Sequence, residues 1–356
     1  MTRHQRAFRS FWSDPEASLS IGCIECPNQD QCGGQTILGG GFNCLDFCCH
    51  EPENCQIVCA NAKLFADRVR EINGFDLRTP SASPLKNFEL EPYIPLFFHG
   101  SKRVELLDEP IISIPLYQFF DRYADCRIKS REHLSNAFKI ALDTRILLSG
   151  VAQDDEVGKW WRLEQKGRLK AINNLSRLGI AMVTTPNFSV TVDRPRWDDM
   201  HSMKRIAEVF HEFVSEGLAA ALHVNGRAAH DFSRWADYII AHPEVTHLSY
   251  EFTTGTKSLP RMHQHAIWLI DLAKAVSRPL GLVLRGGGPV REPLSTYYQV
   301  SALDSSPFEK AVHRSVAVLD EGRRVWVDHP TPEGAPIDEL LRENLRISKL
   351  WFADSA

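Results

Sequence analysis

The sequence predicts an α/β protein, a parallel barrel of the (β/α)8 type preceded by an N-terminal cysteine-rich metal-binding knob. From about residue 96 onward, short apolar runs alternate with stretches of helical periodicity, which is typical of βα units around a parallel sheet. There are roughly eight such runs, which favours a barrel; a doubly wound open sheet is the alternative. Eight of the nine cysteines lie between Cys23 and Cys59, and this density predicts a separate module.

These patterns divide the 356 residues into five segments. They are a basic aromatic arm (1–22), the cysteine-rich module (23–61), a helix and proline-rich linker (62–95), the barrel (96–330) and a C-terminal helix (331–356). A chain of this length can bury a large core.

Strands are predicted where short apolar runs are bounded by polar residues or glycine. These runs are 96–99, 111–116, 145–150, 180–185, 218–225, 245–252, 280–285 and 298–303. Helices are predicted where apolar residues recur every three or four positions. These segments are 61–72, 131–142, 160–178, 198–216, 230–241, 261–277 and 338–351, and we expect the last to pack back onto the barrel.

The cysteine-rich module predicts a metal centre. Its thiols are Cys23, Cys26, Cys32, Cys44, Cys48, Cys49, Cys55 and Cys59. Loops this short and rich in glycine cannot bury enough apolar surface to fold alone, so metal–thiolate bonds would supply the stability. Disulfides are a less favoured alternative, because the basic, polar start of the chain is unlike a secretory signal and cytosolic thiols stay reduced.

Two kinds of metal centre suit these thiols. The pair Cys23-x2-Cys26 suits zinc, and eight thiolates would make two four-cysteine zinc sites. With Cys32, Gly33 and Gly34, the same pair resembles the cysteine run of SPASM-type auxiliary iron–sulfur domains. This resemblance implies one or two [4Fe–4S] clusters, which we favour over zinc. A purely structural cluster remains the alternative to a reactive one.

Charge and hydropathy limit the partners. The net charge of −4 gives no general basic field, but two local segments place cations beside aromatic residues. One is the arm, with Arg3, Arg6 and Arg9, and the other is 159–177, where Lys159 and Arg162 flank two tryptophans. We therefore expect a nucleotide or nucleic acid, and a protein partner, as ligands; a solvated helix face and a frayed terminus are the alternatives. No run of about 18 apolar residues occurs, so we expect a cytoplasmic protein without membrane contact.

Candidate site residues follow the predicted strands, because a parallel barrel carries its active site at the carboxyl ends of the strands. Glu251 is the candidate general base, and Asp154 or Asp155 would be the second acid–base group. Arg285 with Gly286, Gly287 and Gly288 is the candidate phosphate site, since bare backbone N–H groups and a guanidinium suit an anion. The alternatives are a salt bridge between Glu251 and Arg285 and a plain turn at the glycines.

Two short segments resemble known barrels. Residues 302–308 (ALDSSPF), followed by a helix, are similar to a late barrel segment of the tRNA-guanine transglycosylase superfamily, whose members exchange bases in tRNA or DNA. Residues 185–189 (TPNFS), preceding a long helix, resemble barrel proteins of unknown function carried by phages and mobile elements. These resemblances imply nucleic-acid processing or phage defence.

We therefore expect a metal-cluster-containing barrel protein that acts on or binds a nucleotide or nucleic acid. A non-catalytic scaffold or recognition subunit of a larger complex is the first alternative, and an iron–sulfur redox protein is the second. The sequence leaves open whether the chain is an enzyme.

Overall fold

The computed structural model describes residues 62–354, except 86–88, 122–124 and 191–195. The predicted arm (1–22) and the predicted cysteine-rich module (23–61) lie outside the described residues.

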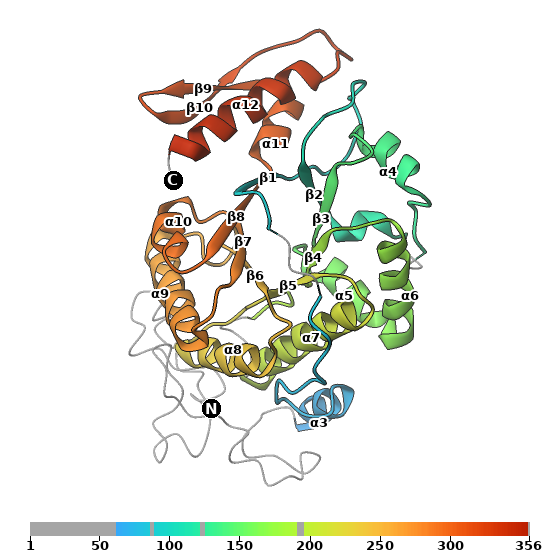
Figure 1. Cartoon of the computed structure of the whole chain (residues 1–356), viewed down its shortest axis with the longest axis vertical. Coiled ribbons are helices and arrows are strands. Elements are labelled where there is room, and N and C mark those ends of the chain that lie inside the picture. The colour runs from blue at the N-terminus through green and yellow to red at the C-terminus, as the bar shows by residue number, and fades with distance from the viewer. Residues whose placement is uncertain (1–61, 86–88, 122–124, 191–195, 355–356) are drawn as a thin grey trace, which may run out of the picture.

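Eight parallel strands form a nearly closed barrel (Figure 1). A bridge between Leu96 and Ser113, with Phe97 N donating to Ser113 O at 2.9 Å, brings the first strand to the second. The predicted α/β parallel barrel is thereby confirmed. The strands, in the order in which they follow the chain, are β1 (Tyr93–Pro95), β2 (Ile111–Pro115), β3 (Arg145–Ser149), β4 (Met182–Thr184), β5 (Ala220–His223), β6 (His247–Glu251), β7 (Gly281–Arg285) and β8 (Gln299–Asp304).

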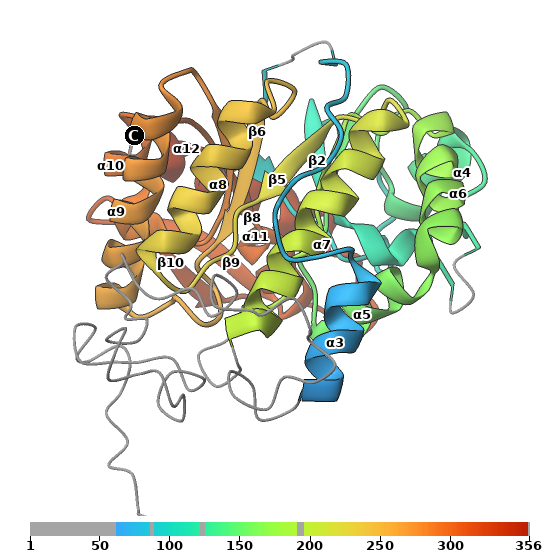
Figure 2. The ribbon, with the colours of Figure 1, turned by 90° about the horizontal axis from the view of Figure 1, so that it is seen from below.

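Helices surround the ring of strands (Figure 1), and α3 lies beside α7 (Figure 2). They are α3 (Ala62–Glu71), α4 (Arg131–Phe138), α5 (Asp154–Arg162), α6 (Glu164–Arg177), α7 (Arg196–Ser215), α8 (Ala229–Ala241), α9 (Leu259–Val276), α10 (Gly288–Ser295), α11 (Ser306–Val312) and α12 (Asp338–Asp354), with a 3-10 helix, η3 (Leu116–Phe119).

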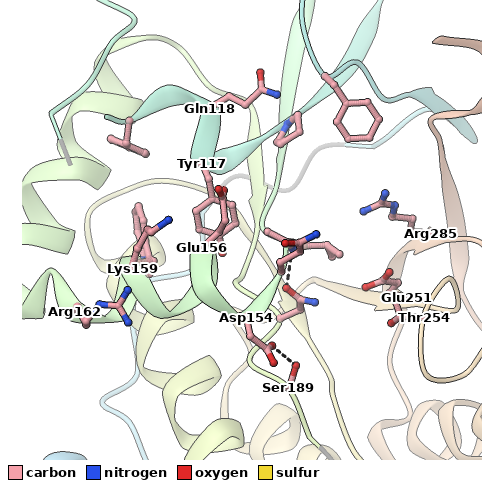
Figure 3. Close-up of a pocket in the computed structure, with 18 of the residues that line it drawn as sticks. Tyr117, Gln118, Asp154, Glu156, Lys159, Arg162, Ser189, Glu251, Thr254 and Arg285 are labelled. Carbon is pink, nitrogen blue, oxygen red and sulfur yellow. Dashed lines mark hydrogen bonds between the residues drawn. The ribbon is translucent and has the colours of Figure 1, made fainter. Parts of the chain in front are cut away.

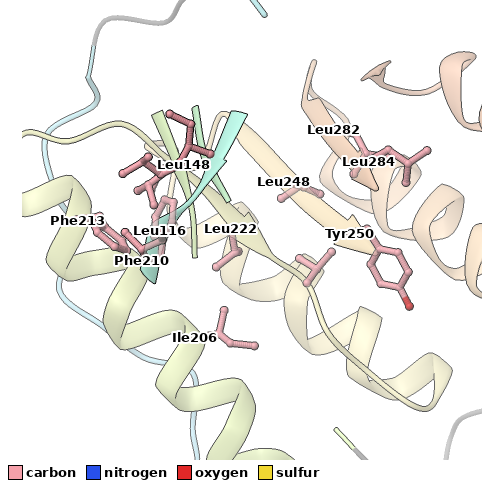
Figure 4. Packing of buried hydrophobic residues seen from close by; sticks show 14 of the residues in the cluster. Leu116, Leu148, Ile206, Phe210, Phe213, Leu222, Leu248, Tyr250, Leu282 and Leu284 are labelled. Atoms are coloured by element: carbon pink, nitrogen blue, oxygen red, sulfur yellow. The ribbon is translucent and has the colours of Figure 1, made fainter. Parts of the chain in front are cut away.

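The main core lies between the strands and the helices. Strands β3, β5 and β6 turn Leu148, Leu222 and Leu248 outward, where they join Ile206 and Phe210 of α7 in one buried cluster (Figure 4). Side chains alternate along a strand, so one set builds this outer core while the other fills the barrel interior. Each fully buried side chain of this kind contributes roughly 1.5–3 kcal/mol.

The barrel interior is filled in levels, each built from alternate strands. A level can be traced from strand to strand, starting at Ser113. At each strand, the path crosses to the register partner on the next strand and then advances by one residue along that strand. After one circuit of the barrel the path returns to Ser113, so the residues on it lie at one level. From the closed end toward the mouth, three successive levels are Ile94, Leu147, Ala221 and Val283; then Ser113, Thr184, Ser249 and Leu303; then Leu96, Ser149, His223 and Arg285. The first level is apolar and the next two are largely polar.

The C-terminal helix, α12, occupies the position of the helix that would be expected between β1 and β2. Residues 96–110, which connect β1 to β2 and are all described, form no helix. Instead the ring of Phe352 in α12 packs on Tyr93 of β1 at 5.5 Å, Asp338 accepts from Val104 N at 2.9 Å, and Lys349 donates to Glu109 at 2.7 Å. The end of the chain thus completes the first βα unit.

Several predicted boundaries are wrong. The first strand is β1 rather than 96–99. Its prolines argued against a strand, because proline cannot donate a backbone hydrogen bond. Pro95 is tolerated because its nitrogen faces β2, and the hydrogen bonds from this segment to β2 begin only at Phe97 N. The predicted helix 160–178 is two helices that begin at Asp154 and break at Glu164, whose φ is +53°.

Two further elements escaped prediction. Helix α10 begins at Gly288, where only a turn or phosphate loop was expected. The strands β9 (Ser315–Asp320) and β10 (Arg323–Asp328) form a hairpin whose two-residue turn has positive φ at Glu321 and Gly322.

Candidate functional site

A cavity of about 1250 Å³ opens at the carboxyl ends of the strands (Figure 3). Its lining includes side chains that follow β2, β3, β4, β6 and β7. This is the position at which parallel barrels carry their sites, and the volume exceeds that of most small-ligand pockets.

Glu251 and Arg285 both line this cavity. They are the last residues of β6 and β7 and are direct register partners. Glu251 accepts a hydrogen bond from Thr253, and both side chains are half-buried. Within the described part of the chain, no ion pair joins the two, so Arg285 keeps its guanidinium available to an anion.

Of the two predicted aspartates, Asp154 and Asp155, only Asp154 is among the described residues that line the cavity. Asp154 lines the cavity and accepts from Ser189 Oγ at 2.5 Å (Figure 3). Asp155 is not among the described lining residues; it is exposed and pairs with Lys159 at 2.7 Å and Arg162 at 3.7 Å. The hydrogen bond from Lys159 lowers the pKa of Asp155. The structure therefore brings Asp154, but not Asp155, to Glu251 and Arg285.

The glycines after Arg285 turn the chain from β7 into α10. Gly286 and Gly287 have φ of +73° and +75°, and a Cβ on Gly287 would lie 2.5 Å from the ring of Phe252. Backbone geometry therefore accounts for both residues. Gly286, Gly287 and Gly288 are not among the described residues that line the cavity, and their role in binding phosphate stays a prediction.

Tyr117 was missed by the sequence analysis. It lies on η3, directly after β2, and its hydroxyl donates to Gly150 O at 3.0 Å, which fixes the ring in the cavity wall. Burial raises the pKa of Tyr117 well above its usual value, so the hydroxyl stays protonated. Applying the strand-end rule to segment 111–116 would have found it.

The basic segment 159–177 serves two purposes. Lys159 and Arg162 line the cavity on the wall opposite Arg285 (Figure 3). Arg127 also lines the cavity. Arg168 instead forms a buried pair with Glu212, with both nitrogen–oxygen distances at 2.7 Å. Only part of the predicted phosphate-binding segment therefore faces the candidate site.

Three histidines lie within strands or shortly after one. His223 is 3% exposed, its Nδ1 lies 3.2 Å from Ser249 Oγ, and burial lowers its pKa to about 4. His247, near the other end of the barrel, is equally buried, and burial lowers its pKa to about 4 as well. His99 is half-buried and bonds to Ser101 at 2.6 Å.

The predicted metal ligands Cys23 to Cys59 lie outside the described residues. Within the described ranges, no group of three or more His, Cys, Asp and Glu side chains suits a metal ion. Cys126, the remaining cysteine, is buried and its thiol donates to Ile128 O at 2.9 Å.

No protein-family model matches the chain, and no curated protein matches it. None of the helices in the described ranges is both long and apolar enough to cross a membrane.

Proposed function

We propose that the barrel mouth binds a nucleotide or a nucleic-acid phosphate through Arg285 and performs acid–base chemistry on it with Glu251 and Asp154. In this proposal the cysteine module holds a metal centre, iron–sulfur by preference, and the protein acts in nucleic-acid processing or phage defence. The observation that carries the proposal is the placement of Glu251 and Arg285 side by side at the ends of β6 and β7, in one cavity and without an ion pair between them.

The lining carries four carboxylates, Asp121, Asp154, Glu156 and Glu251, beside its four cations, so it is the placement of the cations that supports this ligand class. Arg285 lies on one wall and Lys159 with Arg162 on the other (Figure 3), so a ligand with more than one phosphate finds cations at both ends. Tyr117 lies between them and offers an aromatic ring for base stacking. The pairs that Lys159 and Arg162 form with Asp155 are exposed and hence weak, which leaves both cations free to exchange partners.

Two substitutions test the proposal on anaerobically purified protein. Arg285→Gln should weaken the binding of nucleoside monophosphates and short oligonucleotides about tenfold or more, as expected for one charge-assisted contact. Glu251→Gln should keep that binding and lose turnover, by roughly 10²–10⁴-fold, of whichever nucleotide the wild-type protein converts in a chromatographic screen.

Lys170→Gln is the matched control for Arg285→Gln, because Lys170 is an exposed cation on α6 that is not among the described lining residues. Equal binding by the Arg285 and Lys170 variants would contradict the proposal. Metal and sulfide analysis of the same preparation decides between iron–sulfur and zinc.

A further inference from the structure

The barrel interior below the mouth is unusually polar. Interiors of (β/α)8 barrels are dominated by branched apolar side chains. Here, two adjacent levels carry Ser113, Thr184 and Ser249, and then Ser149 and His223 beside Arg285. The neighbours of Ser113 on β2, Ile112 and Ile114, belong to the outer core, which places Ser113 on the inner face.

Two hydroxyls at these levels have no hydrogen-bond partner among the described residues. They are Ser113 Oγ and Ser149 Oγ, on residues that are 0% and 1% exposed. Other members of the levels are paired: Thr184 Oγ1 accepts from Gly150 N at 2.8 Å, and Ser249 bonds to His223. A buried hydroxyl without a partner is costly, so a pair of them in one place points to a ligand group or to ordered water.

These levels adjoin the cavity. On β2, β3 and β6, the residue two positions beyond each inner serine, namely Pro115, Val151 and Glu251, lines the cavity. Arg285 belongs to the same level as Ser149 and His223 and also lines the cavity. Ser113, Ser149 and His223 are not themselves among the described residues that line the cavity; they lie one residue pair deeper in the barrel, beneath the residues that do.

Apart from Arg285, the polar side chains of these levels are neutral. Burial lowers the pKa of His223 to about 4, so its imidazole is uncharged near pH 7 and can both donate and accept. The serine hydroxyls likewise donate and accept. Such a set suits an uncharged group with donors and acceptors and disfavours a phosphate.

We infer that Ser113, Ser149 and His223, here called the inner polar site, hold the uncharged hydrogen-bonding end of the ligand, a sugar hydroxyl or a base edge. This inference rests on the proposed function, in which Arg285 holds the ligand's phosphate. In this arrangement the inner polar site determines the selectivity among phosphorylated compounds, while Arg285 contributes to the affinity for all of them.

The test compares probes that share a phosphate and differ in the uncharged part. The four nucleoside 5′-monophosphates, ribose 5-phosphate and inorganic phosphate are titrated into the full-length protein and its variants by calorimetry. Ser149→Ala and His223→Gln should weaken the tightest organic phosphate about 3- to 10-fold, the effect of one hydrogen bond, and leave inorganic phosphate unchanged. Arg285→Gln should weaken all the probes.

His247→Gln is the matched control, because it removes an equally buried histidine from β6, four residues before Glu251 and away from the mouth. Ser149→Ala deletes a hydroxyl that has no described partner, so this variant should fold even if His223→Gln does not.

The two failures are distinguishable. Equal effects of the inner variants on organic and inorganic phosphate, or no effect on either, would overturn the inner polar site and leave Arg285 as the phosphate ligand. If no phosphorylated probe binds, or if Arg285→Gln changes nothing, the proposed function itself falls, and the inner polar site with it.

Discussion

Gly287 illustrates how a single residue determines the path of the chain directly after Arg285, a residue of the candidate site. Its φ is +75° and a Cβ would lie 2.5 Å from Phe252 Cδ2, whereas a Cβ on Gly288 would have nothing within 4 Å. Gly287→Ala should therefore lower the free energy of unfolding by about 1 kcal/mol or more, and Gly288→Ala should change it by less than about 0.5 kcal/mol. Urea denaturation of both variants measures the difference, and equal stabilities would contradict it.

Glu71 should make stability depend on pH. Its carboxylate accepts from His201 Nε2 at 2.8 Å and from Trp161 Nε1 at 2.6 Å, and the hydrogen bond with His201 is the main cause that lowers the pKa of Glu71 to about 2. A lowered pKa stabilises the fold above the ordinary value of 4.5, and this contribution is lost as the pH falls from 4.5 toward 2.

Glu71→Gln should therefore lower stability at pH 7, by about 1–2 kcal/mol after allowance for solvent screening, and flatten the decline of stability between pH 5 and 2. Denaturation at stepped pH values measures this slope. Asp67→Asn, which removes an exposed carboxylate from the same helix, is the control for the loss of one negative charge. An unaltered slope in Glu71→Gln would show that the carboxylate is not held in this way.

At the residue scale, the order of the strands was enough to predict which side chains lie at the barrel mouth. Glu251, Arg285 and Asp154 were found because the carboxyl ends of parallel strands meet at one face, and the structure places all three in one cavity. Their roles remain proposals. Ser149 and His223 could not be found in this way, because their common level depends on the register between strands, which no local pattern carries.

At the element scale, the pair Arg168–Glu212 joins α6 to α7. Both side chains are buried, and burial raises the pKa of Glu212. Arg168→Met should cost about 3–5 kcal/mol, because it leaves a buried carboxylate unpaired, whereas the double variant Arg168→Met with Glu212→Leu should recover much of that loss. Thermal melts of the two proteins make the comparison; a double variant less stable than the single one would contradict it.

Asn344 attaches the β9–β10 hairpin to α12. It is fully buried, accepts from Ala317 N at 2.7 Å and donates to Ser315 O at 3.0 Å. Asn344→Ala should cost about 2 kcal/mol and speed hydrogen exchange at the Ala317 amide, since buried backbone groups lose their partners. Arg346→Ala, on the exposed face of the same helix, should change neither quantity.

Elements with strong periodicity were predicted within a few residues, and those with special turns were not. The predicted helix 198–216 corresponds to α7, and the predicted strand 111–116 to β2. The break between α5 and α6 depends on the left-handed backbone conformation of Glu164, and the turn of the β9–β10 hairpin depends on the positive φ of Glu321 and Gly322. A non-glycine residue with positive φ leaves little trace in the sequence, because local propensity argues against it.

At the scale of the whole molecule, α12 should be indispensable. Deleting residues 338–356 would expose the outer side of β1 and leave Glu109 and Arg103 without their partners Lys349 and Asp338. We expect the shortened protein to lose its near-UV circular dichroism and its cooperative melt, while Arg346→Ala, on the exposed face of the same helix, should preserve both. A cooperative melt in the shortened protein would contradict this role of α12.

The barrel itself was predictable because its alternation of strands and helices repeats along the chain. The substitution of α12 for the helix of the first βα unit was not, since that contact rests on side chains such as Phe352 and Tyr93, which are 259 positions apart. Sequence periodicity identifies the repeating unit but not which distant segment covers an irregular one.

The pairing of β1 with β8 also determines how long β1 lacks a neighbouring strand during synthesis. Ala302 N, in β8, donates to Pro92 O, directly before β1, at 2.8 Å. β1 therefore gains this neighbour only after β8 has been synthesised. At about 5–20 residues per second, a ribosome needs roughly 10–40 s to travel from one to the other. Throughout that interval the nascent chain carries an unpaired strand edge, the feature that invites aggregation. Chaperones that shield such edges should therefore raise the yield of this protein more than codon choice in its final helix does.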